Sequence, residues 1–226
     1  MFERLKLLIG EENLNKIHNT KVLVVGVGGV GGECVISLVR SGIKDICVID
    51  FDKVDITNIN RQVVAYHSTI GMDKVDVIEK MIIDINPESN VSKYKTFLDK
   101  NNIKEIFDNE KPHFVIDCCD SKDTKKEIIK ECLDRNIMFI SSMGTGNKYD
   151  PSQLEIVDIR KTNNDPLARI FRKWVKDEKI NKKIPVLCSK EVPFHSGKVV
   201  ASNSFVPNSA GLLISSYVIR KIIGKY

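Results

Sequence analysis

The stretch 22–35, "VLVVGVGGVGGECV", places a glycine-rich turn directly after a short apolar run. The apolar residues of 21–27 predict a buried β-strand, and 29–42 predicts a helix that ends at a glycine. Between them stands the pattern G-x-G-x-x-G, which turns the backbone tightly and points the amides of a helix N-terminus at an anion. The stretch therefore predicts a nucleotide-binding turn. It leaves open whether the nucleotide is a dinucleotide used in hydride transfer or ATP used to activate another molecule.

Strand and helix patterns continue to alternate up to residue 144. Helices are expected over 73–86, 102–109 and 123–136, and strands over 45–51, 90–98, 113–120 and 137–144. This alternation predicts an α/β fold, a Rossmann-like doubly wound and mostly parallel sheet with helices on both faces. Ligands of such folds bind beyond the carboxyl ends of the strands, so four strand ends are expected to converge on one crevice. These ends are Gly26, Asp50, Asp120 and Gly144.

The pattern changes after Gly146. Short strands are expected over 152–159, 184–189 and 197–206, around a basic helix over 165–179. No linker rich in glycine or serine, no repeat and no low-complexity segment interrupts the sequence. We therefore expect one domain over 1–226, with a nucleotide-binding core over 1–146 and a C-terminal elaboration of strands and a helix over 147–226.

Composition sets wide bounds on function. The 226 residues are 42% hydrophobic and 29% charged, which is ordinary for a globular protein, and the formal charge of +5 permits a polyanionic partner without requiring one. The six cysteines form no C-x-x-C pair, so the sequence gives no support to a four-thiolate zinc site. The charged, amphipathic start does not have the pattern of a signal peptide, and we expect a reduced, cytoplasmic setting.

The most apolar late segment, 209–224, is interrupted by Arg220 and Lys221. It is too short to span a bilayer comfortably, so a packed helix is expected. Attachment to a membrane surface is the alternative that the sequence leaves open.

The loop after the second expected strand, "DFDKVDITNINRQ" at 50–62, favours ATP. Asp50 at the strand end can accept hydrogen bonds from the hydroxyls of a ribose. A hydride-transfer enzyme needs only that carboxylate here, whereas a triphosphate attacked at its α-phosphorus needs cations and amide donors. Arg61 and Lys74 supply the cations, and Asn58 supplies an amide. Each alone has a simpler explanation, as a helix lysine or a capped loop, but together they favour a phosphate site.

The motifs "GVGGVG", "DFDKVDITNINRQ" and "DCCDS" resemble those of the ThiF/MoeB superfamily, enzymes similar to ubiquitin activators that adenylate carboxylates. The resemblance covers residues 2–144 and implies ATP and Mg²⁺ as cofactors. It also implies that the turn and the following loop bind the nucleotide. The residues concerned are Gly26, Gly28, Gly29, Gly31, Asp50, Asp52, Asn58, Arg61 and Lys74.

The resemblance also implies a catalytic set. In this superfamily an arginine near the N-terminus reaches the ATP of the partner subunit. Arg4 is the residue that matches, which implies a homodimer. Arg61, Lys74 and Asp120 complete the set.

Two aspartates lie near the end of the fourth expected strand, Asp117 and Asp120. The resemblance assigns Mg²⁺ to Asp120, which lies closer to the loop and offers a hard oxygen to a hard cation. Asp117 is expected to support that site or to cap a turn. Ser121 stands where many relatives carry asparagine, a departure that points to a particular branch of the superfamily.

The later half, with three short motifs of the core, resembles the tRNA threonylcarbamoyladenosine dehydratase branch, also called TcdA or CsdL. The matching segments are 40–43, 57–62, 84–88, 141–176, 186–191 and 204–215. The resemblance implies an enzyme that uses ATP to cyclise the threonylcarbamoyl group on an adenosine next to the tRNA anticodon, through an acyl adenylate. Because the ring closure is intramolecular, no protein nucleophile is needed.

With tRNA as the implied substrate, the basic helix gains a role. Arg169, Arg172, Lys173 and Lys176 recur at near-helical spacing and are expected to contact tRNA phosphates. Ile170, Phe171 and Trp174 are expected to anchor the opposite side of the helix in the core. A solvated amphipathic helix is the alternative.

Three other functions stay open at this point. The first is an adenylyltransferase that activates the C-terminal glycine of a ubiquitin-like sulfur carrier, although such enzymes often carry the zinc pairs absent here. It would give a sulfur-transfer protein as a partner, and Cys188 is the only cysteine of the later half, in an apolar setting that favours a buried position. The second is an NAD(P) oxidoreductase, which the set of Asn58, Arg61 and Lys74 argues against. The third is a non-catalytic partner subunit, which the presence of Arg61, Lys74 and Asp120 argues against.

Overall fold

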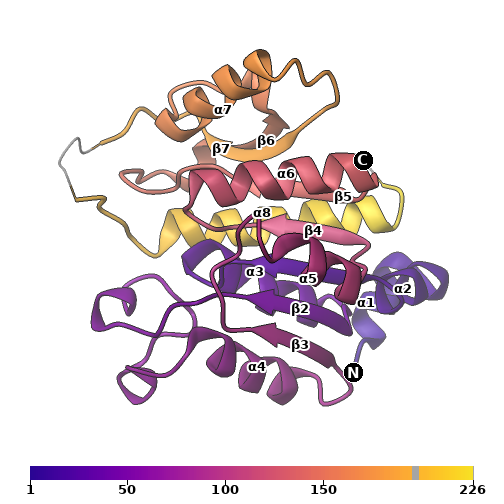
Figure 1. The fold of residues 1–226 in the computed structure, drawn as a ribbon. Helices are drawn as coiled ribbons and strands as arrows, with labels where there is room; N and C mark the ends of the chain where they lie inside the picture. Colours follow the sequence, from indigo (N-terminus) through magenta and orange to yellow (C-terminus); the bar gives the residue numbers. More distant parts are fainter. Residues whose placement is uncertain (195–198, 226) are drawn as a thin grey trace.

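The computed structural model describes residues 1–194 and 199–225. Its strands form one seven-stranded sheet in the order β3-β2-β1-β4-β5-β7-β6 (Figure 1). All neighbouring strands pair in parallel except β6 and β7, which are antiparallel. The strands are β1 (Lys21–Val25), β2 (Asp45–Ile49), β3 (Asn90–Tyr94), β4 (Phe114–Asp117), β5 (Met138–Ser142), β6 (Leu154–Asp158) and β7 (Pro185–Ser189).

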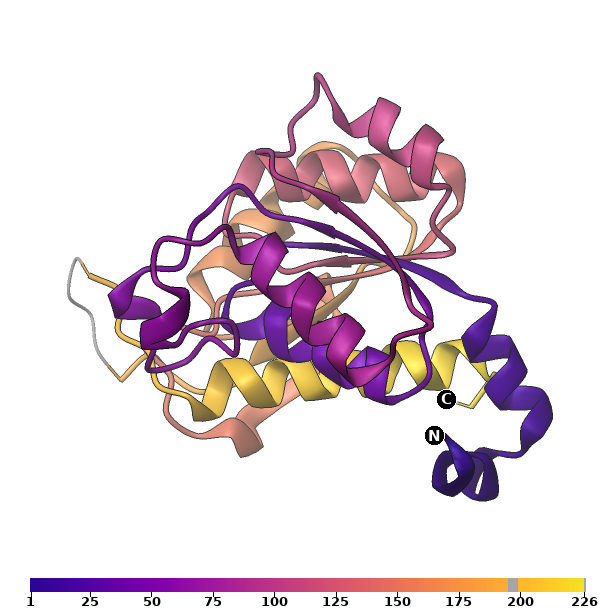
Figure 2. The same cartoon turned by 90° about the horizontal axis from the view of Figure 1, so that it is seen from below.

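Helices cover both faces of this sheet (Figure 2). They are α1 (Glu3–Ile9), α2 (Glu11–His18), α3 (Gly29–Arg40), α4 (Lys74–Ile85), α5 (Ile103–Glu110), α6 (Lys122–Arg135), α7 (Pro166–Asp177) and α8 (Phe205–Ile222). Residues of α3, α4 and α8 form one core with Val22 and Val24 of β1. Residues of α5, α6 and α7 form the other with Leu23 and Val25. The doubly wound α/β fold is confirmed.

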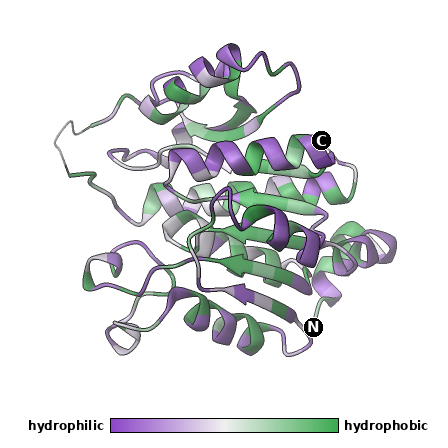
Figure 3. Ribbon diagram, viewed as in Figure 1, coloured by the Kyte–Doolittle hydropathy of each residue, from purple (hydrophilic) through white to green (hydrophobic). Residues whose placement is uncertain are grey.

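The two cores explain why the inner strands β1, β2 and β4 are nearly continuous apolar runs. A parallel strand covered on both faces buries every side chain, whereas a surface helix buries only one side. Figure 3 shows β1, β2 and β4 as largely hydrophobic, and β3 and the side of α6 that faces away from the sheet as largely hydrophilic. The alternation up to residue 144 therefore yields the strands and helices expected, with ends shifted by a few residues.

The C-terminal part joins the same sheet. β7 pairs with β5, with Ser141 opposite Val186, and β6 closes that edge as an antiparallel strand. α8 packs on α3, where a Cβ on Gly211 would lie 2.5 Å from the carbonyl oxygen of Val30. The last apolar segment is thus a packed helix, and no helix in the described chain has the length and apolarity needed to cross a membrane.

The strand expected over 197–206 is wrong for the residues that the structure describes. Residues 199–204 form no strand, and α8 begins at Phe205. The side-chain oxygen of Asn203 accepts hydrogen bonds from the backbone N–H groups of Phe205 and Val206, at 2.9 and 3.0 Å, and so starts the helix. The backbone of Ala201 is bonded instead to Asn147, whose N–H donates to the Ala201 carbonyl oxygen and whose Oδ1 accepts the Ala201 N–H. Residues 197 and 198 lie outside the described residues.

Candidate nucleotide-binding site

A cleft of about 700 Å³ lies beyond the carboxyl ends of β1, β2, β4 and β5. Its lining includes all four strand ends that the sequence predicts to converge. It also includes most of the residues predicted to bind the nucleotide. The strand ends are Gly26, Asp50, Asp120 and Gly144, and the other predicted residues in the lining are Gly28, Gly29, Asp52, Asn58, Arg61 and Lys74.

The glycines of the turn have different roles. Gly26 has a positive φ of 86°, and a Cβ there would lie 2.8 Å from the carbonyl oxygen of Cys118. Gly31 is absent from the cleft lining, because it faces the turn itself, with a hypothetical Cβ only 1.8 Å from the Gly26 oxygen. It allows α3 to approach the turn closely. Gly28 is open towards the cleft, where only the side-chain amide of Gln62 approaches a hypothetical Cβ, at 3.8 Å.

Asp50 is held by the backbone around it. Its Oδ2 accepts the N–H of Val27 at 2.7 Å, and its Oδ1 accepts the N–H of Asp52 at 2.9 Å. Burial raises the pKa of Asp50, and these backbone bonds offset part of that rise. Each carboxylate oxygen can accept a further bond, which suits the two hydroxyls of a ribose.

Lys74 is a buried cation at the start of α4, with its side chain 6% exposed. Its Nζ lies 2.9 Å from Oδ2 of Asp52. The backbone reinforces this pairing, because the N–H of Lys74 donates to the carbonyl oxygen of Asp52. A helix lysine directed into solvent is therefore the wrong description of Lys74. An incoming phosphate would share it with Asp52.

Asn58 and Arg61 are fixed by the short helical turn Ile56–Asn58. The side-chain oxygen of Asn58 accepts the N–H of Asp55 at 3.1 Å, so the amide NH₂ is the group that remains to donate. The Nη1 of Arg61 donates to the carbonyl oxygen of Thr57, and a guanidinium carries further N–H donors. Both side chains line the cleft beside the glycine turn.

Two features of the cleft were not assigned from the sequence. Gln62 is 8% exposed, and its buried Oε1 has no hydrogen-bond partner in the described structure, so it has an unsatisfied acceptor in the cleft wall. Phe51 and Phe97 form an edge-to-face pair with ring centroids 5.3 Å apart. Their rings are largely exposed and line the cleft, as an apolar wall for a base would. Proximity of Phe51 to Asp50 is a sequence signal for this wall, but Phe97 follows another strand.

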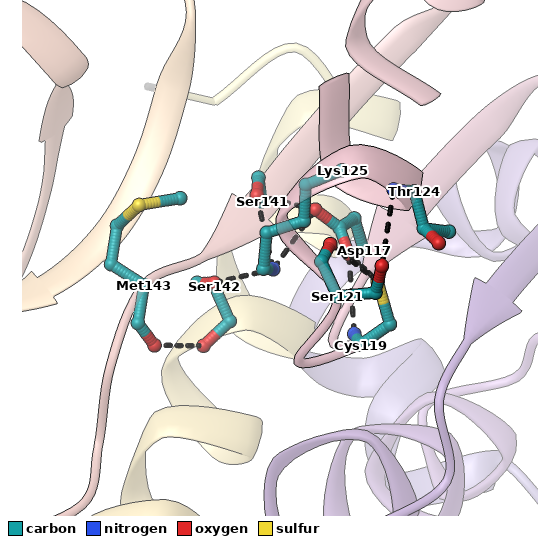
Figure 4. Close-up of polar contacts among 8 residues, drawn as sticks. All are labelled: Asp117, Cys119, Ser121, Thr124, Lys125, Ser141, Ser142 and Met143. Atoms are coloured by element: carbon teal, nitrogen blue, oxygen red, sulfur yellow. Dashed lines mark hydrogen bonds and ion pairs between the residues drawn. The ribbon is translucent and has the colours of Figure 1, made fainter. Parts of the chain in front are cut away.

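The two aspartates after β4 are separated by the structure. Asp120 is exposed in the cleft, whereas Asp117 is completely buried and forms an ion pair with Lys125 of α6 (Figure 4). Within residues 1–194 and 199–225, no group of three or more acidic, histidine or cysteine side chains is arranged to hold a metal. A lone carboxylate fits Mg²⁺ only where phosphate oxygens complete its ligands, which is the usual way in which Mg²⁺ binds at nucleotide sites.

Another part of the cleft lining comes from the segment after β5 and from the C-terminal part. The segment 142–146, Val200, Ser202 and Pro207 form it. Asn147 joins two of these segments, because its N–H donates to the carbonyl oxygen of Ala201 and its Oδ1 accepts the N–H of Ala201, at 2.8 and 2.7 Å. The side-chain amide of Asn60 donates to the carbonyl oxygen of Ser202 at 3.0 Å, so the elaboration closes the cleft directly beside the nucleotide loop.

Arg4 lies outside the cleft lining of its own chain. It is exposed on α1, a helix without buried residues, and α1 lies at the opposite end of the sheet from the cleft (Figures 1 and 2). Its contribution to a partner's site remains a prediction.

The basic helix α7 is amphipathic in the expected sense, with one correction. Phe171 and Trp174 are buried, but Ile170 is 38% exposed, so its assignment to the core is wrong. The 100° step between helical neighbours places it on the outer side together with three cations. Arg169, Lys173 and Lys176 are exposed.

Arg172 of the same helix is half-buried. Its Nη1 donates to the carbonyl oxygen and the hydroxyl of Thr162, at 2.9 and 2.6 Å. This nitrogen ties α7 to the segment before it. A second hollow, of about 780 Å³, runs along α7 and includes Lys126 of α6.

All six cysteines are free thiols, and none has the environment of a nucleophile. Cys188 is 1% exposed on β7, and burial raises its pKa to about 12. Burial also raises the pKa of Cys118 and Cys119 at the edge of the cleft. The expectation of a buried strand position for Cys188 is confirmed.

Comparison with known proteins agrees with this geometry. The chain is 40% identical to the tRNA threonylcarbamoyladenosine dehydratase of Bacillus subtilis (strain 168), over 98% of this chain and 94% of that protein. The Escherichia coli enzyme TcdA, solved in complex with ATP, superposes with a TM-score of 0.93 at 30% identity, covering 99% of this chain and 93% of that one. The adenylyltransferase and sulfurtransferase UBA4 of Vanderwaltozyma polyspora is 35% identical over 72% of this chain, but over only 36% of its own length. The ThiF family model matches residues 2–224, and the chain belongs to the ThiF family.

Proposed function

We propose that this protein is an ATP-dependent tRNA threonylcarbamoyladenosine dehydratase. The observation that carries the proposal is the cleft itself. It brings a glycine turn, a ribose-type carboxylate and two phosphate-type cations together, in a chain that is similar over nearly its whole length to enzymes of that name. A dinucleotide site for hydride transfer needs no Arg61 or Lys74 beside the turn.

The reaction proceeds in two steps. A carboxylate oxygen of the modified adenosine attacks the α-phosphorus of ATP, and the bond to pyrophosphate breaks with its electron pair on the departing oxygen. The neighbouring ureido nitrogen then attacks the activated carbonyl, loses its proton to solvent, and AMP leaves. The sum of the two steps is ATP consumed, AMP and pyrophosphate released, and one water removed from the nucleoside.

This chemistry asks the protein for positioning and charge stabilisation. Asp50 orients the ribose, while Lys74 and Arg61 stabilise the negative charge that develops on the phosphates, with Asn58 as an additional donor. Ring closure needs no acyl-enzyme, which fits the buried thiols with raised pKa values. Asp120 would hold Mg²⁺ together with phosphate oxygens, and the ion would supply further charge neutralisation there.

The tRNA would approach from the C-terminal side. Residues of 142–146 and 200–207 line the cleft, and 200–207 is joined to the nucleotide loop by the hydrogen bond from the Asn60 amide to the Ser202 carbonyl oxygen. The base and its threonylcarbamoyl group would enter along these segments. The exposed cations of α7, Arg169, Lys173 and Lys176, would contact phosphates, which fixes orientation without reading sequence. We further propose a homodimer, with Arg4 completing the site of the partner, in a cytoplasmic setting.

A second candidate is adenylation of a sulfur-carrier protein. The partial similarity to UBA4 favours it, whereas the absence of C-x-x-C pairs from the sequence and the burial of Cys188 do not. A carrier protein that ends in Gly-Gly would stimulate pyrophosphate exchange if this function were the true one.

The decisive experiment incubates the purified protein with ATP, Mg²⁺ and tRNA that carries threonylcarbamoyladenosine. We expect AMP, pyrophosphate and, by nucleoside mass spectrometry, a modified adenosine lighter by one water. tRNA without the modification serves as the control and should yield neither AMP nor pyrophosphate above background. An unchanged nucleoside with a folded, ATP-binding enzyme would contradict the proposal, and exchange stimulated only by the carrier protein would favour the second candidate.

A further inference from the structure

A buried ion pair lies directly beneath the cleft, between the ends of two neighbouring strands (Figure 4). Asp117 is the last residue of β4, and Lys125 lies in the first turns of α6. Lys125 Nζ and Asp117 Oδ2 are 3.0 Å apart, and both side chains are only 1% exposed. The superfamily motif accounts for Asp120 in this region but gives no function to this pair.

Every polar group of the pair has a partner. Lys125 Nζ also donates to the carbonyl oxygen of Ser142 at 2.7 Å and to the hydroxyl of Ser141 at 3.4 Å. The Ser141 hydroxyl in turn donates to Asp117 Oδ2 at 2.5 Å. Asp117 Oδ1 accepts the backbone N–H of Cys119 at 3.2 Å and its thiol at 3.1 Å. Although burial alone lowers the pKa of Lys125, the Asp117 carboxylate raises it above its ordinary value, so the lysine stays charged.

These bonds reach two separate segments that line the cleft. The N–H of Cys119 belongs to the loop that carries Asp120, one residue further on. The carbonyl of Ser142 belongs to the segment 142–146, which also lines the cleft. The pairing register places Asp117 beside Ser141 on adjacent strands, so the ion pair lies where the two loops diverge.

A buried ion pair is a weak source of stability, because apolar side chains of similar volume often serve as well. It differs from an apolar contact because its donors and acceptors must meet particular partner atoms, which fixes the orientation of the groups that they join. We infer that the Asp117–Lys125 pair positions the loop of Asp120 relative to the segment 142–146, without touching the nucleotide itself. This inference rests on the proposed function for its catalytic readout.

The test removes both charges together, because a single substitution would leave an uncompensated buried ion and could unfold the protein. The variant is Asp117→Asn with Lys125→Met. The matched control is Lys21→Met with Glu110→Gln, an ion pair of 2.8 Å and low exposure between the start of β1 and the end of α5, outside the cleft lining. Both proteins are compared with the unmodified chain for melting temperature, ATP affinity with and without Mg²⁺, and kinetics on modified tRNA.

We expect the cleft variant to keep its ATP affinity without Mg²⁺, because Asp50 and Lys74 are untouched. The tightening of ATP binding by Mg²⁺ should be lost, and kcat should fall by about 10- to 100-fold with little change in KM for ATP, as a displacement of about 1 Å would cause. Faster hydrogen exchange at the Cys119 amide should accompany these losses. The control should change the melting temperature alone.

Two outcomes would overturn the inference. One is a folded cleft variant with kcat and Mg²⁺ response within about twofold of the control. The other is an equal catalytic loss in both variants, which would trace the effect to stability alone. Failure of the proposed function is a separate result, because the unmodified protein would then be inactive on tRNA while the Mg²⁺ response and hydrogen exchange still test the pair.

Discussion

The cations and carboxylates around the cleft differ in how firmly the fold holds them. Lys74 is buried and paired with Asp52, and Asp50 is held by two backbone amides. Asp120, by contrast, is exposed. The buried groups are thus preorganised for phosphates and ribose, while Asp120 depends on its loop for position. A substitution of Asp120 therefore tests its catalytic role directly, because it removes an exposed charge and leaves no buried ion without its partner.

Asp120→Asn should lower kcat for adenylate formation by about 10²-fold or more, the usual loss when one group that stabilises a transition-state charge is removed. ATP–pyrophosphate exchange across a Mg²⁺ titration measures the loss, and filter binding measures tRNA affinity, which should stay unchanged. Asp123→Asn is the control, since its side chain is 91% exposed and pairs only with surface Lys126. Equal loss of exchange and of tRNA binding would contradict a specific role for Asp120.

Among the secondary-structure elements, α7 shows most clearly how a helix divides structural from exposed residues. Asp165 caps its N-terminus by accepting the N–H of Ala168 at 2.9 Å, and Pro166 begins it. Phe171 and Trp174 bury one side. Arg172 lies between the two sides and is engaged by Thr162, so it is a poor choice for testing tRNA contact.

The variant Arg169→Ala, Lys173→Ala, Lys176→Ala should therefore weaken tRNA binding without affecting ATP binding. The slope of log Kd against log salt should fall by about 2, since each lost phosphate contact contributes about 0.7 to 0.9. The matched control replaces three exposed lysines by alanine: Lys80 on α4, Lys100 just before α5 and Lys104 on α5. An unchanged slope in the α7 variant would remove this helix from the tRNA surface.

At the scale of the whole molecule, the distance between α1 and the cleft has a consequence for assembly. Arg4 lies on α1, at the end of the sheet opposite the cleft (Figure 1), and it does not line the cleft of its own chain. A homodimer in which each subunit completes the site of the other follows from that geometry if Arg4 is catalytic.

Complementation tests this arrangement. Arg4→Ala and Asp120→Asn chains should each be inactive alone. Mixed and allowed to exchange subunits, they should recover about a quarter of the normal activity, since half the dimers are mixed and each holds one intact site. Recovery is measured by AMP release on modified tRNA. No recovery, with mixed dimers present by native mass spectrometry, would place Arg4 outside the partner's site.

The architecture and most of the nucleotide cleft could be predicted from the amino-acid sequence. The glycine turn, Asp50 and the loop 50–62 are local features, and the geometry of a parallel sheet brings strand ends together whatever the remaining residues are. Asn58, Arg61 and Lys74 could be placed beside the turn for that reason.

Features that depend on contacts between residues distant in the chain could not be predicted and are visible only in the folded protein. Lys125 has the appearance of an ordinary lysine in a charged helix, and its burial arises because β5 brings Ser141 and Ser142 beside Asp117. Gly31 packs against the turn because the Gly26 carbonyl oxygen leaves no room for a side chain there, and 199–204 forms part of the cleft lining in place of a strand because the Ala201 backbone is bonded to Asn147. Periodicity reports which side of an element is apolar, whereas the partner that covers it is set by packing across the whole fold.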